Sequence, residues 1–148
     1  MTVDDALRNV ANIGIDTAPL IYFVENHPVF APIVTEIFSR IDRGTIVGVV
    51  SMLTVTETLI HPKRYGNQVL EEQYRDILLN SQNIAAFVIN AEIAERAADL
   101  RAHYSLRTPD AIQVATALVS GCDAFLTNDN DLARVSEINV IVVSSLTL

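Results

Sequence analysis

The chain has 148 residues, half of them hydrophobic and 19% charged, which predicts one folded domain with a buried core and excludes a disordered chain. Its single cysteine, Cys122, excludes a disulfide framework and a thiolate metal cage. The net charge of −8 disfavours nucleic acid as a partner, unless two bound divalent cations halve that charge where a phosphate must sit.

Residues 1–11 are expected to form a short helix or an arm ahead of the first strand. This lead is acidic, and it lacks the basic start and apolar stretch of a signal peptide. No apolar run in the chain is long enough to span a bilayer. We therefore expect a cytoplasmic protein that does not use a membrane as a partner.

Short apolar runs alternate with amphipathic segments along the rest of the chain, which is typical of an α/β fold. Strands are expected at 12–16, 46–50, 86–89, 123–127 and 140–143. Helices are expected at 17–25, 32–43, 51–60, 66–81, 91–104 and 109–118, with a short one after the turn at 128–131. The run 46–50 is apolar throughout, as in a strand buried on both faces of a parallel sheet. The pattern predicts a doubly wound parallel sheet with helices on both faces.

Two helices place an acid beside an apolar face. Thr108 is expected as an N-cap with Pro109 as the first helical residue, so that Asp110 lies in the first turn, where the helix dipole favours a carboxylate. The apolar stripe expected beside it is Ala111, Val114, Ala115, Leu118 and Val119. In the helix at 51–60, ended by His61 and Pro62, Glu57 flanks an expected buried face of Met52, Leu53, Val55, Leu59 and Ile60.

Sites in parallel α/β sheets form outside the carboxyl ends of the strands. Asp16 and Asp129 follow two expected strands, and Glu57 lies in the helix after a third. Each of these acids, taken alone, also fits a cap, a turn or a solvated helix flank. Several carboxylates in one cleft repel one another unless cations or protons neutralise them. Oxygen ligands suit Mg²⁺ or Mn²⁺, which can activate water against a phosphodiester.

Other kinds of site fit the sequence poorly. Asp129 could begin a calcium loop, but Arg134 and Val140 occupy the positions that need glycine and glutamate. The three histidines have no serine elbow, and no Gly-rich phosphate loop is present.

Four segments, in this order and spacing, resemble those of a PIN domain, most closely the VapC-type ribonuclease toxins of toxin–antitoxin pairs. The segments are Ile15–Tyr22, Leu53–Glu57, Leu106–Ala117 and Phe125–Leu132. The resemblance covers nearly all of the chain after residue 11, and the lead before Asp16 is longer than is usual in the family. It implies a single PIN-like domain over 1–148, with a three-layer fold, that acts as a ribonuclease with one or two Mg²⁺ or Mn²⁺ ions. A homodimer and a cognate antitoxin are the implied protein partners.

The resemblance also assigns roles to individual residues. The acids implied to bind metal and act in catalysis are Asp16, Glu57, Asp110 and Asp129, with Asp131 as a further ligand found in some members. The residues implied to orient phosphate or metal-bound water are Thr17, Thr127 and Asn128. Arg107, just before the Asp110 helix, is the best placed basic residue for contact with an RNA phosphate.

The leading hypothesis is a metal-dependent endoribonuclease that is the toxin of a type II toxin–antitoxin pair. One alternative is a PIN-like RNA-processing nuclease outside such a pair. Another is a PIN-like module with little catalysis that holds a partner protein, which the negative charge favours. A receiver-like phosphoacceptor domain would also place an aspartate such as Asp16 at a strand end, but a convincing lysine after a late strand is missing.

Overall fold

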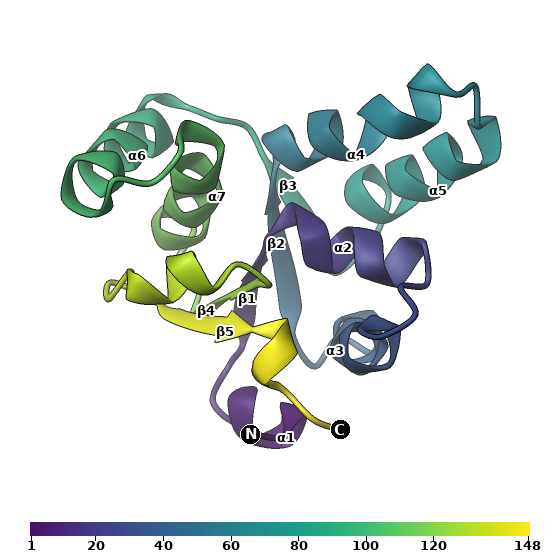
Figure 1. Ribbon diagram of the computed structural model, residues 1–148, viewed down its shortest axis with the longest axis horizontal. Coiled ribbons are helices and arrows are strands. Elements are labelled where there is room, and N and C mark those ends of the chain that lie inside the picture. The colour runs from purple at the N-terminus through teal and green to yellow at the C-terminus, as the bar shows by residue number, and fades with distance from the viewer.

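A computed structural model describes residues 1–148 and confirms the parallel α/β fold (Figure 1). Five strands, all parallel, form one sheet in the order β3-β2-β1-β4-β5. The strands are β1 (Asn12–Ile15), β2 (Val47–Ser51), β3 (Ile84–Phe87), β4 (Ala124–Thr127) and β5 (Asn139–Val142). The α-helices are α1 (Val3–Ala6), α2 (Thr17–Val24), α3 (Ala31–Asp42), α4 (Met52–Arg64), α5 (Gln68–Leu79), α6 (Ala91–Tyr104) and α7 (Thr108–Val119). Two short 3₁₀ helices are η1 (Asn130–Arg134) and η2 (Val143–Ser145).

The sheet separates two hydrophobic cores, one on each face. Helices α2 and α3 lie on one side of it, and α6 and α7 on the other (Figure 1). Successive residues of a strand point to opposite faces. In β4, Ala124 and Leu126 therefore join the core under α2 and α3, whereas Phe125 joins the core under α6 and α7. Both faces of the sheet are covered, which explains the continuous apolar runs in the sequence.

Strand β1 is central, and the chain turns to opposite sides of it. From β1 it proceeds outward through β2 to β3, and later it returns to β4 on the other side of β1. The carboxyl ends of β1 and β4 therefore flank the point where the strand order reverses. In open α/β sheets, this crevice is where ligands bind.

Most predicted elements form within about two residues of their expected bounds, but the third strand is shifted. It covers Ile84–Phe87 instead of 86–89, because these four residues pair in register with Gly48–Ser51 of β2. Val88 and Ile89 lie beyond the sheet and are 64% and 41% exposed. The apolar run in the sequence continues beyond the strand. The end of β3 is set by β2, with which it forms hydrogen bonds.

Helix α4 departs from the prediction at its end and on its buried face. It continues through Pro62 to Arg64, because a proline this near the last turn removes only the hydrogen bond to the Thr58 carbonyl. The buried residues are Thr54, Thr58 and Pro62, not the expected apolar set. The Thr58 hydroxyl donates to the carbonyl of Thr54 at 2.8 Å. Because this hydrogen bond forms within the helix, the hydroxyl needs no other partner when it is buried.

Helix α7 begins one residue earlier than predicted. Arg107 is the N-cap, Thr108 the first helical residue and Pro109 the second, and the cap residue makes no side-chain hydrogen bond. The buried surface of α7 is also wider than the expected apolar stripe, because the helix lies between the sheet and α6. Gln113 and Thr116 are buried along with its alanines, while the outer part of the expected stripe is only half-buried.

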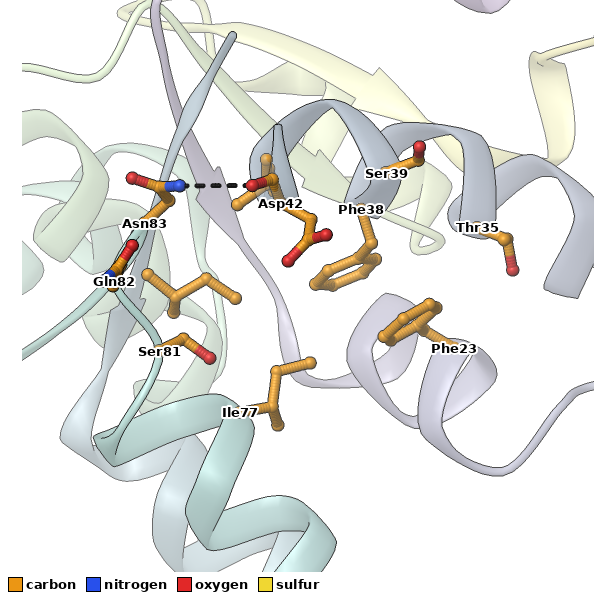
Figure 2. A pocket seen from close by; sticks show the side chains of 11 residues that line it. Phe23, Thr35, Phe38, Ser39, Asp42, Ile77, Ser81, Gln82 and Asn83 are labelled. Atoms are coloured by element: carbon orange, nitrogen blue, oxygen red, sulfur yellow. Dashed lines mark hydrogen bonds between the residues drawn. The ribbon is translucent and has the colours of Figure 1, made fainter. Parts of the chain in front are cut away.

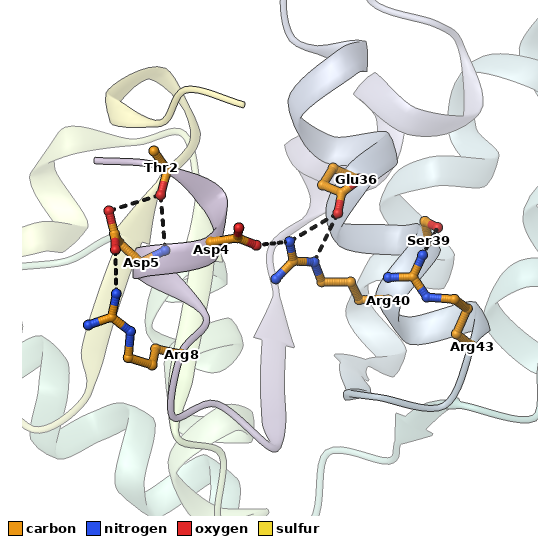
Figure 3. Close-up of polar contacts among 8 residues, drawn as sticks. All are labelled: Thr2, Asp4, Asp5, Arg8, Glu36, Ser39, Arg40 and Arg43. Atoms are coloured by element: carbon orange, nitrogen blue, oxygen red, sulfur yellow. Dashed lines mark hydrogen bonds and ion pairs between the residues drawn. The ribbon is translucent and has the colours of Figure 1, made fainter.

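The N-terminal lead folds as a short helix that packs into the main core. Val3, Ala6 and Leu7 are buried there. The Val3 N–H donates to the Thr147 carbonyl at 2.9 Å, which joins the two ends of the chain. Figure 3 shows Arg40 of α3 between Asp4 of α1 and Glu36, so that an ion-pair cluster fastens the lead to α3.

None of the helices combines the length and the apolar composition needed to cross a bilayer.

Candidate active site

Four carboxylates from four separate elements line one pocket of about 320 Å³ at the switch point of the sheet. Asp16 follows β1 and Asp129 follows β4, while Glu57 lies on α4 and Asp110 on α7. These are the four acids that the sequence singled out. They are spread over more than a hundred residues of the sequence, and folding places them around one pocket.

Asp16 is held from two sides. It is the N-cap of α2, where one carboxylate oxygen accepts from the Thr17 N–H at 2.8 Å. The other accepts from the Thr127 hydroxyl at 2.8 Å. The pKa of Asp16 is raised, first by burial and further by the negative charges of Asp110 and Glu57, although both hydrogen bonds oppose this change. Asp110 and Glu57 line the same pocket as Asp16, which explains why their charges act on it.

Thr127 lies behind the pocket instead of in it. It is fully buried, and its hydroxyl accepts from the Asp129 N–H at 3.1 Å while it donates to Asp16. Thr127 therefore does not line the pocket, and the expectation that it orients phosphate or metal-bound water stays a prediction. Its role is to join the ends of β1 and β4 and orient Asp16.

Asp129 caps the short helix η1, and its carboxylate accepts from the Asp131 N–H at 2.9 Å. Asp131 is exposed and is not among the residues that line the pocket. Of the five acids expected to bind metal, the structure therefore gathers four and leaves Asp131 outside.

A buried hydrogen-bond network holds Glu57. Its Oε1 accepts from the Thr17 hydroxyl at 2.7 Å and from the Gln113 amide at 3.1 Å. The same amide nitrogen lies 2.9 Å from the hydroxyl oxygen of Thr54. Sequence reasoning missed both Gln113 and Thr54. The signal was that each lies one helical turn from a candidate acid, Gln113 after Asp110 and Thr54 before Glu57.

Asp110 is paired with the only basic residue of the pocket. The Arg107 Nε donates to its Oδ2 at 3.0 Å, with the arginine side chain 80% exposed and the aspartate side chain 16% exposed. The pKa of Arg107 is raised, mainly by Asp110 and also by the charges of Asp129 and Glu57. The guanidinium thus lies at the mouth of the pocket, in the field of three acids.

Asn128 links the pocket to two further elements. Its amide nitrogen donates to the Tyr22 hydroxyl at 3.1 Å, and its amide oxygen accepts from the Ser144 N–H at 2.9 Å. Thr17, Asn128 and Arg107, three of the four residues expected to orient phosphate, therefore line the pocket itself.

The model of the PIN domain family matches residues 13–138, which is most of the chain and includes all four carboxylates. The chain belongs to the PIN domain family. The comparison with curated proteins finds no match.

Solved structures described as toxins or toxin–antitoxin complexes share this fold. A toxin–antitoxin complex from Klebsiella pneumoniae contains a chain that is 26% identical, with a TM-score of 0.68 over 90% of this chain and 97% of that one. VapC20 from Mycobacterium tuberculosis, described as a toxin that cleaves the Sarcin-Ricin loop, is 14% identical, with a TM-score of 0.69 over 87% and 99%. VapBC2 from Rickettsia felis, bound to promoter DNA, is 12% identical, with a TM-score of 0.70 over 88% and 98%.

The pocket of this PIN domain has the donor chemistry that a divalent ion prefers, because carboxylates line it and no histidine or cysteine does. As placed, no three acidic, histidine or cysteine side chains stand close enough together to hold one ion. Asp110 faces Arg107, and both oxygens of Asp16 accept hydrogen bonds. Binding one ion between the carboxylates would therefore require them to move closer together, and Asp110 Oδ1 is free of the contact with Arg107.

The PIN domain has a second, larger hollow of about 610 Å³ among α2, α3, α5 and the start of β3 (Figure 2). Phe23 and Phe38 stack there with ring centroids 4.4 Å apart, and Ile77 points toward them. Asp42 is the only charged residue in its lining. With one carboxylate, this hollow lacks the ligands for a metal-dependent site, so size alone does not identify the active site.

Proposed function

We propose that this PIN domain is a Mg²⁺- or Mn²⁺-dependent endoribonuclease and the toxin of a toxin–antitoxin pair. The observation that carries the proposal is the convergence of Asp16, Glu57, Asp110 and Asp129 on one pocket, beside the exposed Arg107. Four carboxylates in one pocket favour a bound cation, and a bound cation there makes a phosphate acceptable to a chain of net charge −8. The similarity to a chain of a toxin–antitoxin complex, and to a toxin described as cleaving the Sarcin-Ricin loop, supports the same function.

Each side chain has a distinct part in this proposal. Asp16, Asp110 and Asp129 would hold the ion, and Glu57 would hold a second ion or orient the attacking water. Once bound, the ion would supply a more acidic water and neutralise charge at the phosphodiester. Arg107, released from Asp110, would bind a phosphate oxygen through its guanidinium, and Asn128 and Thr17 would keep the pocket wall in place.

The test is cleavage of a labelled RNA with Mg²⁺ or Mn²⁺, with and without a chelator. Asp16→Asn and Asp110→Asn should each lower the cleavage rate by about 100-fold or more, because each removes a charged ligand. Asp131→Asn is the matched control and should retain the rate within about threefold, since Asp131 lies outside the pocket. Equal cleavage by all four proteins, or cleavage that survives the chelator, would disprove the proposal.

The protein partners are part of the proposal. We expect a cognate antitoxin, because the similar structures from Klebsiella pneumoniae, Rickettsia felis and Salmonella typhimurium are toxin–antitoxin or VapBC assemblies. We also expect a homodimer, as the family resemblance implies. Light scattering of the purified chain measures the second expectation directly, and a mass of one chain of 16.2 kDa would contradict it.

A further inference from the structure

Glu57 is backed by two polar side chains that are almost completely buried. Gln113 on α7 is 3% exposed and Thr54 on α4 is fully buried. The Gln113 Nε2 lies 2.9 Å from the Thr54 hydroxyl oxygen, 3.2 Å from that of Thr17 and 3.1 Å from Glu57 Oε1. The two threonine hydroxyl oxygens are 3.2 Å apart. Four side chains from three helices thus share one hydrogen-bond network, which is buried at Gln113 and Thr54 and opens to the pocket at Thr17 and Glu57.

The directions of the hydroxyl hydrogen bonds in this network follow from counting protons. The Thr17 hydroxyl has one proton, and it is donated to Glu57 at 2.7 Å. In the contact between Thr17 and Thr54, the proton must then come from Thr54. Thr54 can therefore only accept from the Gln113 amide. All donors in the network point, directly or through a neighbour, toward the Glu57 carboxylate.

The orientation of the Gln113 amide is determined in the same way. If the amide were turned over, its oxygen would face the Glu57 carboxylate and the network would lose its first donor. In the orientation observed, Gln113 Oε1 is buried and has no hydrogen-bond partner. A buried acceptor without a partner costs free energy, which the contacts of the amide nitrogen with Thr54, Thr17 and Glu57 offset.

We propose that Gln113 and Thr54 are positioning residues that, together with Thr17, hold the Glu57 carboxylate in place at the pocket, and so set the affinity of the pocket for a divalent cation. The inference rests on the proposed metal-dependent function, and it adds two residues to that site. Outer partners that orient a metal ligand typically change metal affinity by about 10–100-fold when they are removed.

Helix α4 offers a matched control for Thr54. Thr58 lies one turn further along the same helix and is also buried, 3% exposed. Its hydroxyl donates only to backbone carbonyls of its own helix, those of Thr54 and Val55. Thr54→Val and Thr58→Val therefore remove the same atom at equal burial, but only the first removes a member of the network.

The experiment measures Mn²⁺ binding by isothermal titration calorimetry, with thermal unfolding in chelator as a check on folding. Thr54→Val and Gln113→Met should each weaken Mn²⁺ binding by about 10-fold or more, whereas Thr58→Val should stay within about threefold of the unmutated protein. Thr54→Ser keeps the hydroxyl and should restore the affinity. The unfolding temperatures of Thr54→Val and Thr58→Val should be similar.

The outcomes separate the two proposals. If the unmutated protein binds neither Mn²⁺ nor Mg²⁺, the proposed function fails and this inference fails with it. If it binds Mn²⁺ but Thr54→Val and Gln113→Met bind it equally well, the proposed function stands and the positioning role is disproved. A loss of affinity in Thr58→Val equal to that in Thr54→Val would also disprove it, because the effect would then come from helix packing.

Discussion

Asp16 and Asp123 are both aspartates next to strands, yet their surroundings change the two pKa values in opposite directions. Burial and two neighbouring carboxylates raise the pKa of Asp16. Two backbone N–H groups, those of Asn12 and Ala11, donate to Asp123 and lower its pKa. Ionised Asp16 therefore destabilises the folded protein, whereas ionised Asp123 stabilises it.

This difference predicts opposite effects of the same substitution on stability. Asp16 has a folded-state pKa above its unfolded value, so its ionisation lowers the stability of the metal-free protein as pH rises through that folded value. In chelator at pH 7, Asp16→Asn should therefore raise the unfolding temperature, and the gain should shrink on acidification toward pH 4. Asparagine still caps α2, so the helix start is retained.

Asp123→Asn is the control with the opposite sign. The lowered pKa of Asp123 contributes stability above its unfolded value that is lost as pH falls through the folded value. This substitution should lower the unfolding temperature at pH 7, and the loss should shrink on acidification. Thermal unfolding at pH 7 and pH 4 measures both, and equal signs for the two variants would contradict this account.

Single residues also show why part of the site escapes sequence reasoning. Asp16, Asp110 and Asp129 were predictable because each stands at a strand end or helix start, where local rules place a carboxylate. Gln113 and Thr54 obey no such local rule, since a buried glutamine or threonine is identified only by its partner on another helix. Thr127 was predicted as a site residue, but the sequence does not show which way its hydroxyl points. In the structure it donates to Asp16 at the end of β1.

Helix α7 packs directly on β1, and one glycine makes this possible. A methyl group added at Gly14 would lie 2.5 Å from the Ala117 Cβ and 3.0 Å from the Phe125 ring. Neither neighbour is the free end of a long side chain, so the helix itself would have to move. Since α7 carries Asp110 and Gln113, its distance from β1 also positions two site residues.

We predict that Gly14→Ala lowers the free energy of unfolding by about 1–3 kcal/mol, as overpacking of a tight core does. The measurement is chemical denaturation in chelator. Gly48→Ala on β2 is the comparison, because its new methyl group would meet side-chain carbons of Ile15, Ile41 and Ile84 at 3.1–3.3 Å, which can give way. A smaller loss is expected there, and an equal or larger one would contradict the close-approach explanation.

The ends of elements were less predictable than their existence. Strand β3 ends at its last residue paired with β2. Helix α4 continues through Pro62 near its last turn. Burial on α4 and α7 depended on which neighbours cover each helix, which hydrophobic periodicity alone does not specify. Periodicity identifies an element because it is a local property, whereas bounds and buried faces are properties of pairs of elements.

The whole molecule carries a net charge of −8, and four of its carboxylates line one pocket. A cation that binds only the folded chain stabilises it by mass action. At an ion concentration 100 times the dissociation constant this amounts to about 2.7 kcal/mol, or a rise of about 5–10 °C in unfolding temperature for a chain of this size. Stability should therefore depend on divalent ions.

We predict that Mn²⁺ raises the unfolding temperature of the unmutated protein and that a chelator reverses the change. Asp110→Asn should remove most of the rise, whereas Asp131→Asn should keep it, because only Asp110 lies in the pocket. Differential scanning fluorimetry across a series of ion concentrations measures the effect. An equal rise in Asp110→Asn would mean that the ions bind elsewhere on this acidic surface.

The amino-acid sequence by itself determined the fold class, the order of strands and helices, and the four acids with their positions at strand ends and on helices. These follow from local periodicity, capping and composition, which each segment carries with it. Only the tertiary structure decided that Thr127 is buried behind Asp16, that Asp131 stays outside, and that Gln113 and Thr54 stand behind Glu57. The physical reason is that hydrogen-bond partners far apart in sequence are chosen by the packing of helices against the sheet, and no local pattern records that choice.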